Sequence, residues 1–489
     1  MGSKDFTQPV ACEALVPQLD RRRFLTGVST VGAAVSAAVG AAAVASVTTA
    51  RAQTVPPPGA MSPVNLSTLP PPATPLACQP PSRSTSRNQV TFQKDISRLV
   101  DLNATNQGGQ YWRYSTLITP VEDFFIRNEY PTPVAALDRR VDPRFWQLKI
   151  HGDAVENPIT LSYEDLLRLP SRSIISNMEC AGNGRSLFWE QQDMTEGPSN
   201  KVGGTGWGLG GVGCAEWQYV PMTAIFDLVG IKKTAKHCLF WSGVDGKTPG
   251  AVSDTGRPMP MAHLLKYAGD IGLAFKMNGN TLTPDHGAPV RVIAPGWCGA
   301  ASTKWLTEIK IASHNFWVRL NSSAHVMIGP SFAPPVAADN DEFRNVQRGG
   351  ILGKAVTWSP PRSLLTIPLR LQKQPKMPHN YPLSAGELPV LKAGQQTLRG
   401  YAWAPQFGVR WVDVRINGGR WQSVAMVDPQ INQYTWRRFE FNWRALPGEH
   451  VIETRVTDAK GYQQPSTVPF NEGGFDFWGI PKFRVAVTA

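Results

Sequence analysis

One short segment combines a thiol, small residues and a cation: Met178-Glu179-Cys180-Ala181-Gly182-Asn183-Gly184-Arg185. Small residues after a cysteine favour a tight turn with an accessible sulfur, and a nearby arginine favours the thiolate. A thiolate binds soft or high-valent metals, or acts as a nucleophile. On residue types alone, a buried structural cysteine is the commoner outcome. Cys180 is therefore either a metal ligand or nucleophile, or a packed thiol.

Other apparent motifs lack the context that their chemistry requires. Gly208-x-Gly210-x-x-Gly213 matches the dinucleotide fingerprint, but no apolar strand precedes it and no amphipathic helix follows at once. Asp254-Thr255-Gly256 occurs once, whereas an aspartic protease pairs two carboxylates. The cysteines form neither a Cys-x-x-Cys pair nor a cluster at zinc spacing. We expect no nucleotide site, iron–sulfur cluster, covalent haem, structural zinc or disulfide framework.

The turn at Cys180 resembles the Cys-Ala-Gly-Asn-x-Arg signature of the sulfite oxidase family of molybdopterin-dependent oxidoreductases, in particular its exported bacterial sulfite and sulfane dehydrogenases. The resemblance is specific over about residues 120–311 and looser over 390–485, which together make about two thirds of the chain. The further matching segments are Phe124-Phe125-Ile126-Arg127-Asn128, Trp207, Cys214-Ala215-Glu216-Trp217, Met277-Asn278-Gly279, Asp285-His286-Gly287-Ala288-Pro289-Val290-Arg291, Lys304-Trp305-Leu306 and Gly400-Tyr401-Ala402-Trp403.

This resemblance implies a molybdenum–molybdopterin cofactor with Cys180 as the protein's ligand to the metal. The cofactor would carry out oxygen-atom transfer, and the protein would position and tune it. The resemblance places Arg127 and Trp207 in the catalytic pocket, where a small anionic substrate binds. The residues that match positions around the pterin and its phosphate are Phe125, Asn128, Arg185, Asp245, His286, Arg291 and Lys304.

The residue types suit these roles, because guanidinium and ammonium groups pair with phosphate charge and also donate hydrogen bonds. Arg291 stands in an apolar Pro-Val-Arg-Val-Ile run, where a buried charge is seldom left unpaired, which favours a phosphate or carboxylate partner. Each residue also has a structural alternative. His286 could be a turn residue, Trp207 a packing residue and Lys304 a solvated surface residue.

Four departures from the family pattern concern the substrate pocket. Glu129 follows Arg127-Asn128 where the family has histidine, no tyrosine follows Ser313-His314, and Gln430-Ile431-Asn432 occupies the region of a C-terminal arginine. Gly203 stands where the family has a pocket lysine, although Lys201 is close by. With fewer polar and cationic groups, a small dianion would bind less well. We expect oxidation of sulfite or a related sulfur compound. The alternatives are a different substrate, including reduction of an oxygenated one, or a non-catalytic secreted β-sandwich binding protein.

The N-terminal segment indicates export. Asp20-Arg21-Arg22-Arg23-Phe24-Leu25 precedes a weakly apolar run of alanine and valine interspersed with glycine and serine, followed by Ala50-Arg51-Ala52. This pattern predicts a twin-arginine signal over residues 1–52 and a periplasmic protein without a membrane span in its mature form, the alternative being an uncleaved anchor.

Charge narrows the choice of partner. The net charge is +12, and it becomes +10 when the five basic and three acidic side chains of residues 1–52 are set aside. A positive surplus favours anionic substrates. Because the lysines and arginines are scattered beyond the signal, we do not expect nucleic-acid binding.

Composition shifts divide the remainder of the chain into three parts. Residues 53–90 form a proline-rich lead-in, 91–358 a mixed α+β molybdopterin-binding oxidoreductase domain, and 359–489 an immunoglobulin-like β-sandwich that mediates homodimerisation. No electron carrier is built in, so the resemblance implies an external acceptor, a c-type cytochrome. The expected elements are strands at 146–150, 173–177, 237–242, 289–293, 397–403, 409–416, 420–426, 434–441 and 450–457, and helices at 161–169, 223–229 and 261–267.

Overall fold

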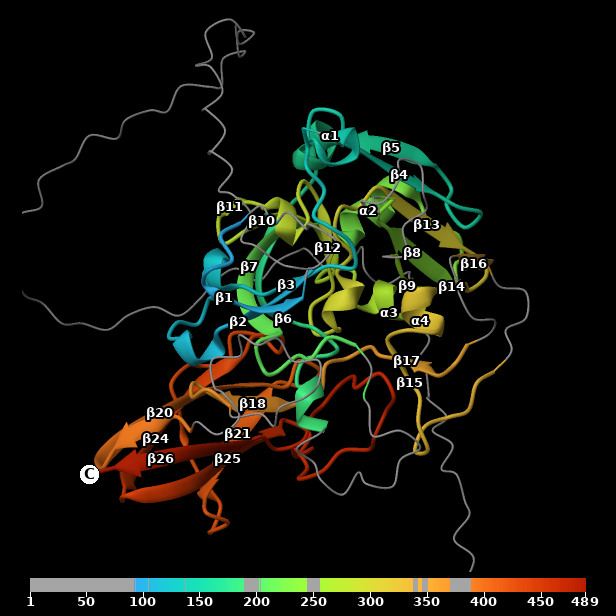
Figure 1. Cartoon of the computed structure of the whole chain (residues 1–489). Helices are drawn as coiled ribbons and strands as arrows, with labels where there is room; N and C mark the ends of the chain where they lie inside the picture. The colour runs from blue at the N-terminus through green and yellow to red at the C-terminus, as the bar shows by residue number, and fades with distance from the viewer. Residues whose placement is uncertain are drawn as a thin grey trace, which may run out of the picture. The chain divides into compact units, whose positions relative to one another are not determined.

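The computed structural model describes the greater part of the chain beyond residue 91 (Figure 1). None of the described helices is long and apolar enough to cross a membrane. The predicted signal, the lead-in and Asp245 lie outside the described residues. Those residues are 92, 94–103, 105–136, 138–188, 202, 204–243, 256–336, 342–344, 351–369 and 388–489.

A five-stranded antiparallel sheet carries the Cys180 turn. Its strands follow the order β11-β10-β7-β6, and β12 also pairs with β10. Strand β6 becomes progressively more buried toward its end, where Glu179 pairs with Val212 of β7, so the chain enters the interior just before Cys180. This confirms the strand expected before the cysteine. The strand bounds are β6 Arg172–Glu179, β7 Val212–Pro221, β10 Gly272–Met277, β11 Asn280–Thr281 and β12 Arg291–Ile293.

A second five-stranded sheet has the order β5-β4-β13-β8-β9, in which only β4 and β13 run parallel. Three short helices contribute to its core through Leu166, Ile225 and Leu264. The first helix starts after Ser162, whose side chain accepts a hydrogen bond from the Asp165 backbone. The bounds are β4 Gln147–His151, β5 Ile159–Ser162, β8 His237–Trp241, β9 Arg257–Pro260, β13 Glu308–Ala312, α1 Tyr163–Arg168, α2 Met222–Val229 and α3 Met261–Lys266.

Smaller elements bring further residues to the end of β6. Strand β3 carries Arg127, and helix α4 begins with Arg319. The small sheets have the orders β1-β2-β3, β14-β16 and β15-β17. The bounds are β1 Leu99–Asn103, β2 Asn106–Gly109, β3 Ile126–Arg127, β14 Phe316–Val318, α4 Arg319–Ser322, β15 Val326–Met327, β16 Glu342–Arg344 and β17 Lys354–Ala355.

The C-terminal part consists of two sheets, β18-β20-β24-β23 and β19-β26-β25-β21-β22, whose inward residues share one core (Figure 1). Asn417 and Gly418 adopt positive φ between β21 and β22, as a tight hairpin turn requires. The immunoglobulin-like topology and the role in dimerisation remain predictions. The bounds are β18 Arg362–Leu365, β19 Val390–Lys392, β20 Gly394–Trp403, β21 Val409–Ile416, β22 Gln422–Ser423, β23 Ala425–Met426, β24 Arg437–Ala445, β25 Gly448–Asp458 and β26 Lys482–Thr488.

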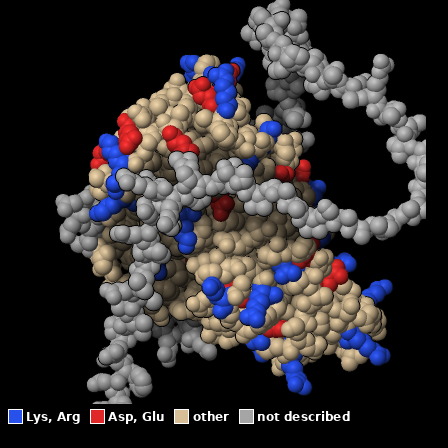
Figure 2. All heavy atoms as spheres, turned by 180° about the vertical axis from the view of Figure 1, so that it is seen from behind, with Lys and Arg blue, Asp and Glu red and all other residues tan. Residues whose placement is uncertain are grey.

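Charged side chains are dispersed over the face shown in Figure 2. Lysines and arginines stand among acidic and uncharged residues, and on the described part of this face they form no continuous basic stripe. A nucleic-acid footprint is normally such a stripe or patch. The dispersed arrangement is consistent with a small-molecule partner.

Candidate active site

The Cys180 turn is fixed by backbone hydrogen bonds and by a packed guanidinium. The Cys180 amide donates to the Gly211 carbonyl at 2.8 Å, and the Asn183 amide donates to the Cys180 carbonyl at 2.9 Å. A Cβ atom at Gly182 would lie 2.6 Å from the Arg185 guanidinium, so a side chain there would displace the arginine that folds back over the turn. The small residues of the motif therefore make room for a cation beside the thiol.

The sulfur of Cys180 is buried, which corrects the expectation of an accessible thiol. Cys180 is 6% exposed and belongs to an apolar cluster, although the residue also lines two cavities. Burial raises the pKa of the Cys180 thiol, and the opposing effects of Arg127 and Arg185 do not overcome it. A thiolate at this position therefore depends on a metal, because coordination itself removes the proton.

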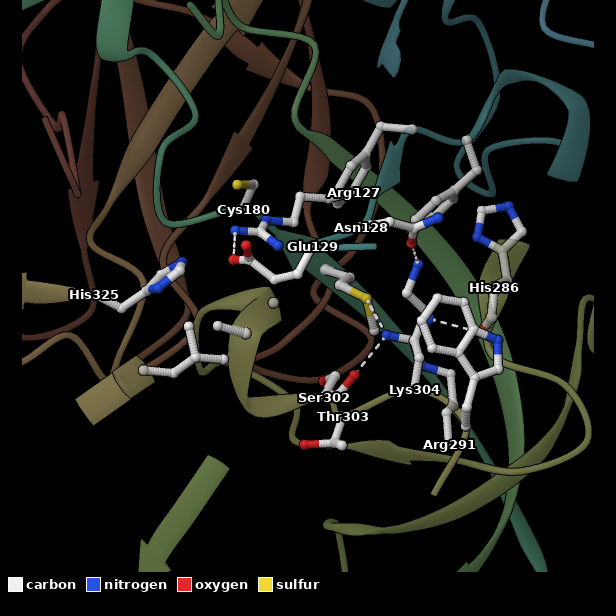
Figure 3. Close-up of a pocket in the computed structure, with 17 residues that line it drawn as sticks. Arg127, Asn128, Glu129, Cys180, His286, Arg291, Ser302, Thr303, Lys304 and His325 are labelled. Atoms are coloured by element: carbon white, nitrogen blue, oxygen red, sulfur yellow. Dashed lines mark hydrogen bonds and ion pairs between the residues drawn. The ribbon is translucent and has the colours of Figure 1, made fainter. Parts of the chain in front are cut away.

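Arg291 is a buried cation on the first of these cavities, which has a volume of about 730 Å³ (Figure 3). Its guanidinium donates to the carbonyls of His286 and Ser302, each at 2.9 Å, and it contacts the Met178 sulfur at 3.2 Å. Burial lowers the pKa of Arg291 to about 9. Among the described residues no ion pair to Arg291 is found, and its charge is met by these carbonyl dipoles and by the Trp217 ring, whose centroid lies 5.2 Å from the guanidinium carbon.

Lys304 adds a second cation to the same cavity. Its ammonium donates to the Asp285 carbonyl oxygen at 2.7 Å and to the side-chain oxygen of Asn128. The Asp285 carboxylate is directed elsewhere, toward the Thr132 hydroxyl at 2.6 Å and the Lys94 amide at 2.9 Å. Burial, followed by the charge of Arg291, lowers the pKa of Lys304 well below its usual value. This part of the cavity is therefore prepared for an anion.

The second cavity, of about 1190 Å³, is also lined by Cys180 and Arg127, and Trp207 and Arg185 line it as well. Trp207 is 2% exposed and meets the Phe125 ring edge-on at 5.9 Å. Phe125 lines the first cavity, so the two aromatic rings form part of the wall between the two spaces. The structure thus assembles the expected residues around Cys180, apart from Asp245, which is not described.

Several residues at the site were not anticipated. His325 and Arg319 line the second cavity, Thr303 lines the first, and the Lys94 ammonium lies 3.3 Å from a ring nitrogen of His286. They come from segments scattered over more than 200 residues, with no local motif around any of them. Glu129, noticed only as a departure from the family pattern, lines both cavities.

Glu179 connects the Cys180 turn to the C-terminal sheets. One of its carboxylate oxygens accepts from Arg362 at 2.5 Å and from Asn183 at 2.9 Å, and the other accepts from Trp403 at 2.8 Å. Glu179 and Arg362 are 4% and 3% exposed. Because Glu179 immediately precedes Cys180, this buried network fixes the backbone from which the thiol projects.

A molybdopterin cofactor fits the residues present. Arg127, Arg291 and Lys304 supply three positive charges to the first cavity, and Glu129 is its only described carboxylate. The Thr303 hydroxyl is buried without a hydrogen-bond partner among the described residues. Uncompensated buried cations are costly without an anionic partner, which a pterin phosphate would supply. No cluster of three His, Cys, Asp or Glu side chains occurs in the described part, so the metal's remaining ligands would have to come from the cofactor.

Comparison with known proteins agrees with this geometry. The family described as "Oxidoreductase molybdopterin binding domain" matches residues 134–317. The mitochondrial sulfite oxidase of Homo sapiens is 28% identical over 365 residues, covering 72% of this chain and 58% of that protein. The sulfite oxidase of Arabidopsis thaliana is also 28% identical, covering 72% and 84%. The chain therefore spans little more than half the length of the human relative.

The crystal structure of the sulfane dehydrogenase SoxCD from Paracoccus pantotrophus shares the fold. The TM-score is 0.59 at 24% sequence identity, with 78% of this chain and 84% of that chain covered. Fold, pocket and sequence together define a molybdopterin-binding oxidoreductase domain. Over 72% of its length the chain is similar to sulfite oxidases, and residues 134–317 match the molybdopterin-binding oxidoreductase family.

Proposed function

We propose that this chain is an exported molybdenum-cofactor oxidoreductase that oxidises sulfite or a related sulfur compound and passes the electrons to an external acceptor. The observation that carries the proposal is the position of Cys180, which lines both a cavity that contains Arg291 and Lys304 and a second cavity that contains Arg185 and Trp207. Arg127 lines both cavities. One thiol would then touch both the cofactor and the space in which a substrate reacts.

The residues divide into holding and binding roles. Cys180 would ligate molybdenum, and Arg291 and Lys304 would neutralise the pterin phosphate through charge-assisted hydrogen bonds. The bound cofactor would supply oxygen-atom transfer together with storage of two electrons. Arg127 would orient the substrate, while the Trp207 ring would keep water from one side of the reacting atoms.

Location and partners are part of the same proposal. The Arg21-Arg22-Arg23 segment supports export of a folded, cofactor-loaded protein to the periplasm. The two C-terminal sheets would mediate homodimerisation, and a c-type cytochrome would accept the electrons. The SoxCD relative is titled a sulfane dehydrogenase, which supports a reduced sulfur compound as the substrate class.

Metal analysis and one substitution test the proposal. Purified active protein should contain about one molybdenum per chain, and Cys180→Ser should lose the metal and the activity. Cys238→Ser is a matched control, because Cys238 is also buried but lies on β8 and lines neither cavity. Active material without molybdenum would contradict the proposal, as would a Cys180→Ser protein with normal activity.

A molybdenum enzyme acting on another substrate is the second candidate, because Glu129 faces the pocket. A substrate panel run with an artificial electron acceptor and then with an artificial donor separates oxidation from reduction. A non-catalytic binding protein would instead keep its ligand affinity when Cys180 is replaced by serine.

A further inference from the structure

Glu129 pairs with two arginines, Arg127 and Arg319. Figure 3 shows it beside Arg127, in the cavity that Cys180 also lines. One of its oxygens accepts from Arg127 and also from Arg319, the latter at 2.9 Å. All three side chains are largely buried, with exposures of 21%, 28% and 19% for Glu129, Arg127 and Arg319. Each arginine therefore already has a carboxylate partner in a poorly solvated place, where ion pairs are strong.

The charges lining the second cavity nearly balance. Its described cations are Arg127, Arg185 and Arg319, and its described carboxylates are Glu129 and Glu472, which leaves one net positive charge. The imidazole of His325 also lines this cavity. Burial, together with the charge of Arg127, lowers the pKa of His325 well below its usual value, so His325 is neutral at pH 7.

The remaining cations do not change this balance at the substrate side. Arg291 and Lys304 line the first cavity but not the second. The Arg185 guanidinium donates to two carbonyls, those of Thr205 at 2.7 Å and Gly473 at 2.9 Å. Its hydrogen-bonding capacity is thus partly used by the backbone, although its charge still contributes.

An uncharged residue also lines the second cavity. Asn106 is 6% exposed, and its side-chain oxygen is buried without a donor among the described residues. The amide therefore adds no positive charge to this space. A dianion entering the cavity would meet one net positive charge with Glu129 already counted, which cannot replace the water that the dianion gives up.

We propose that Glu129 determines specificity by limiting the second cavity to sulfur compounds whose reacting group carries no more than one negative charge. The inference rests on the proposed function and narrows its substrate class. Dianions such as fully ionised sulfite would be poor ligands because Glu129 already holds Arg127 and Arg319.

Two probes of similar shape test the charge rule. Sulfate is a tetrahedral dianion, and methanesulfonate presents the same SO₃ group with a single charge. We would measure both affinities by calorimetry on the molybdenum-loaded protein at pH 7 and constant ionic strength. The wild type should bind methanesulfonate at least as tightly as sulfate. Glu129→Gln should tighten sulfate binding about tenfold and methanesulfonate binding by less, so that the preference reverses.

Glu308→Gln is the matched control. Glu308 has a similar exposure of 22%, pairs with His151 at 2.9 Å and lines neither cavity, so neither affinity should change. Arg319→Met is a second variant with the opposite prediction, because Glu129 would then face Arg127 alone. Both anions should bind more weakly to it, sulfate more so. The Arg319→Met protein tests the inference if Glu129→Gln does not fold.

Two results would overturn the inference: a wild type that prefers sulfate, or a folded Glu129→Gln protein whose sulfate affinity is unchanged. Molybdenum content is measured on the same samples. Normal metal with unchanged sulfate binding refutes the role of Glu129 alone, whereas a chain that never holds molybdenum refutes the proposed function.

Discussion

We predict that the protein loses folding stability when the buried ion pair between Glu179 and Arg362 is broken. Replacing Arg362 with methionine keeps much of its volume but leaves the Glu179 carboxylate without its cation in a place where both residues are less than 5% exposed. Only the amide of Asn183 and the indole of Trp403 would remain as recorded donors. Removing one partner of a buried pair costs about 3 to 5 kcal/mol.

Arg399→Met provides the comparison within the same two sheets. Arg399 pairs with Glu440 at 2.8 Å, but these side chains are 65% and 41% exposed. Solvent screens such a pair, so its loss should cost about 0 to 1 kcal/mol. The two variants remove the same group from ion pairs of similar length, and they differ chiefly in burial.

Thermal unfolding of the two variants measures the difference. For a folded region of about 400 residues, 3 to 5 kcal/mol corresponds to about 4 to 6 °C in the unfolding midpoint. Arg362→Met should show this shift and, because Glu179 adjoins Cys180, should also lower the molybdenum content. A midpoint no lower than that of Arg399→Met would refute the assignment of stability to the buried pair.

Three further predictions follow from the site and the hairpin. Phosphate should raise the unfolding temperature of the metal-free protein more than chloride does at equal ionic strength. Arg291→Gln should reduce this gain, because Arg291 lacks a described counter-ion that would compete with phosphate. An equal gain in the variant would contradict the role of Arg291 in anion binding. Burial would raise the pKa of Glu129, but Arg127 and Arg319 outweigh it and hold that pKa at about 2. Since this value is lower than in the unfolded chain, the stabilisation is present above about pH 4.3 and is lost as the pH falls toward 2. The stability difference between wild type and Glu129→Gln should therefore shrink from pH 6 to pH 3 in thermal unfolding, and a constant difference would count against the ion pairs. Gly418→Ala should cost about 1 kcal/mol in urea unfolding because φ is +69° there, whereas Gly419→Ala, whose φ is not positive, should cost less.

Local patterns predicted the elements that carry the site. The sequence pattern located β4, β6 and β8 to within a few residues, because β4 alternates between buried and exposed residues and β8 is a continuous buried run. The expected helix over 161–169 begins two residues before the observed start of α1 at Tyr163, which follows Ser162. The cap is chosen by the reciprocal hydrogen bonds between Ser162 and Asp165, which the apolar spacing does not reveal.

The candidate site was predictable where a family motif exists and not elsewhere. His286, Arg291 and Lys304 come together as the resemblance implied. His325 could not be anticipated, because its approach to Cys180 depends on packing between distant segments. Burial of the Cys180 sulfur was also missed, since small residues indicate a tight turn but say nothing of what packs over it.

The segment around Gly473 determines when the surroundings of the Cys180 turn can be completed during synthesis. Its carbonyl receives a hydrogen bond from Arg185, 288 positions earlier, and the Asp476 amide donates to Ala181 in the Cys180 turn. During translation the turn emerges long before these partners exist. Its walls can close only after the ribosome has released that late stretch, so a large prosthetic group must be loaded after synthesis of this region, and nascent chains stalled before it should be unable to retain one.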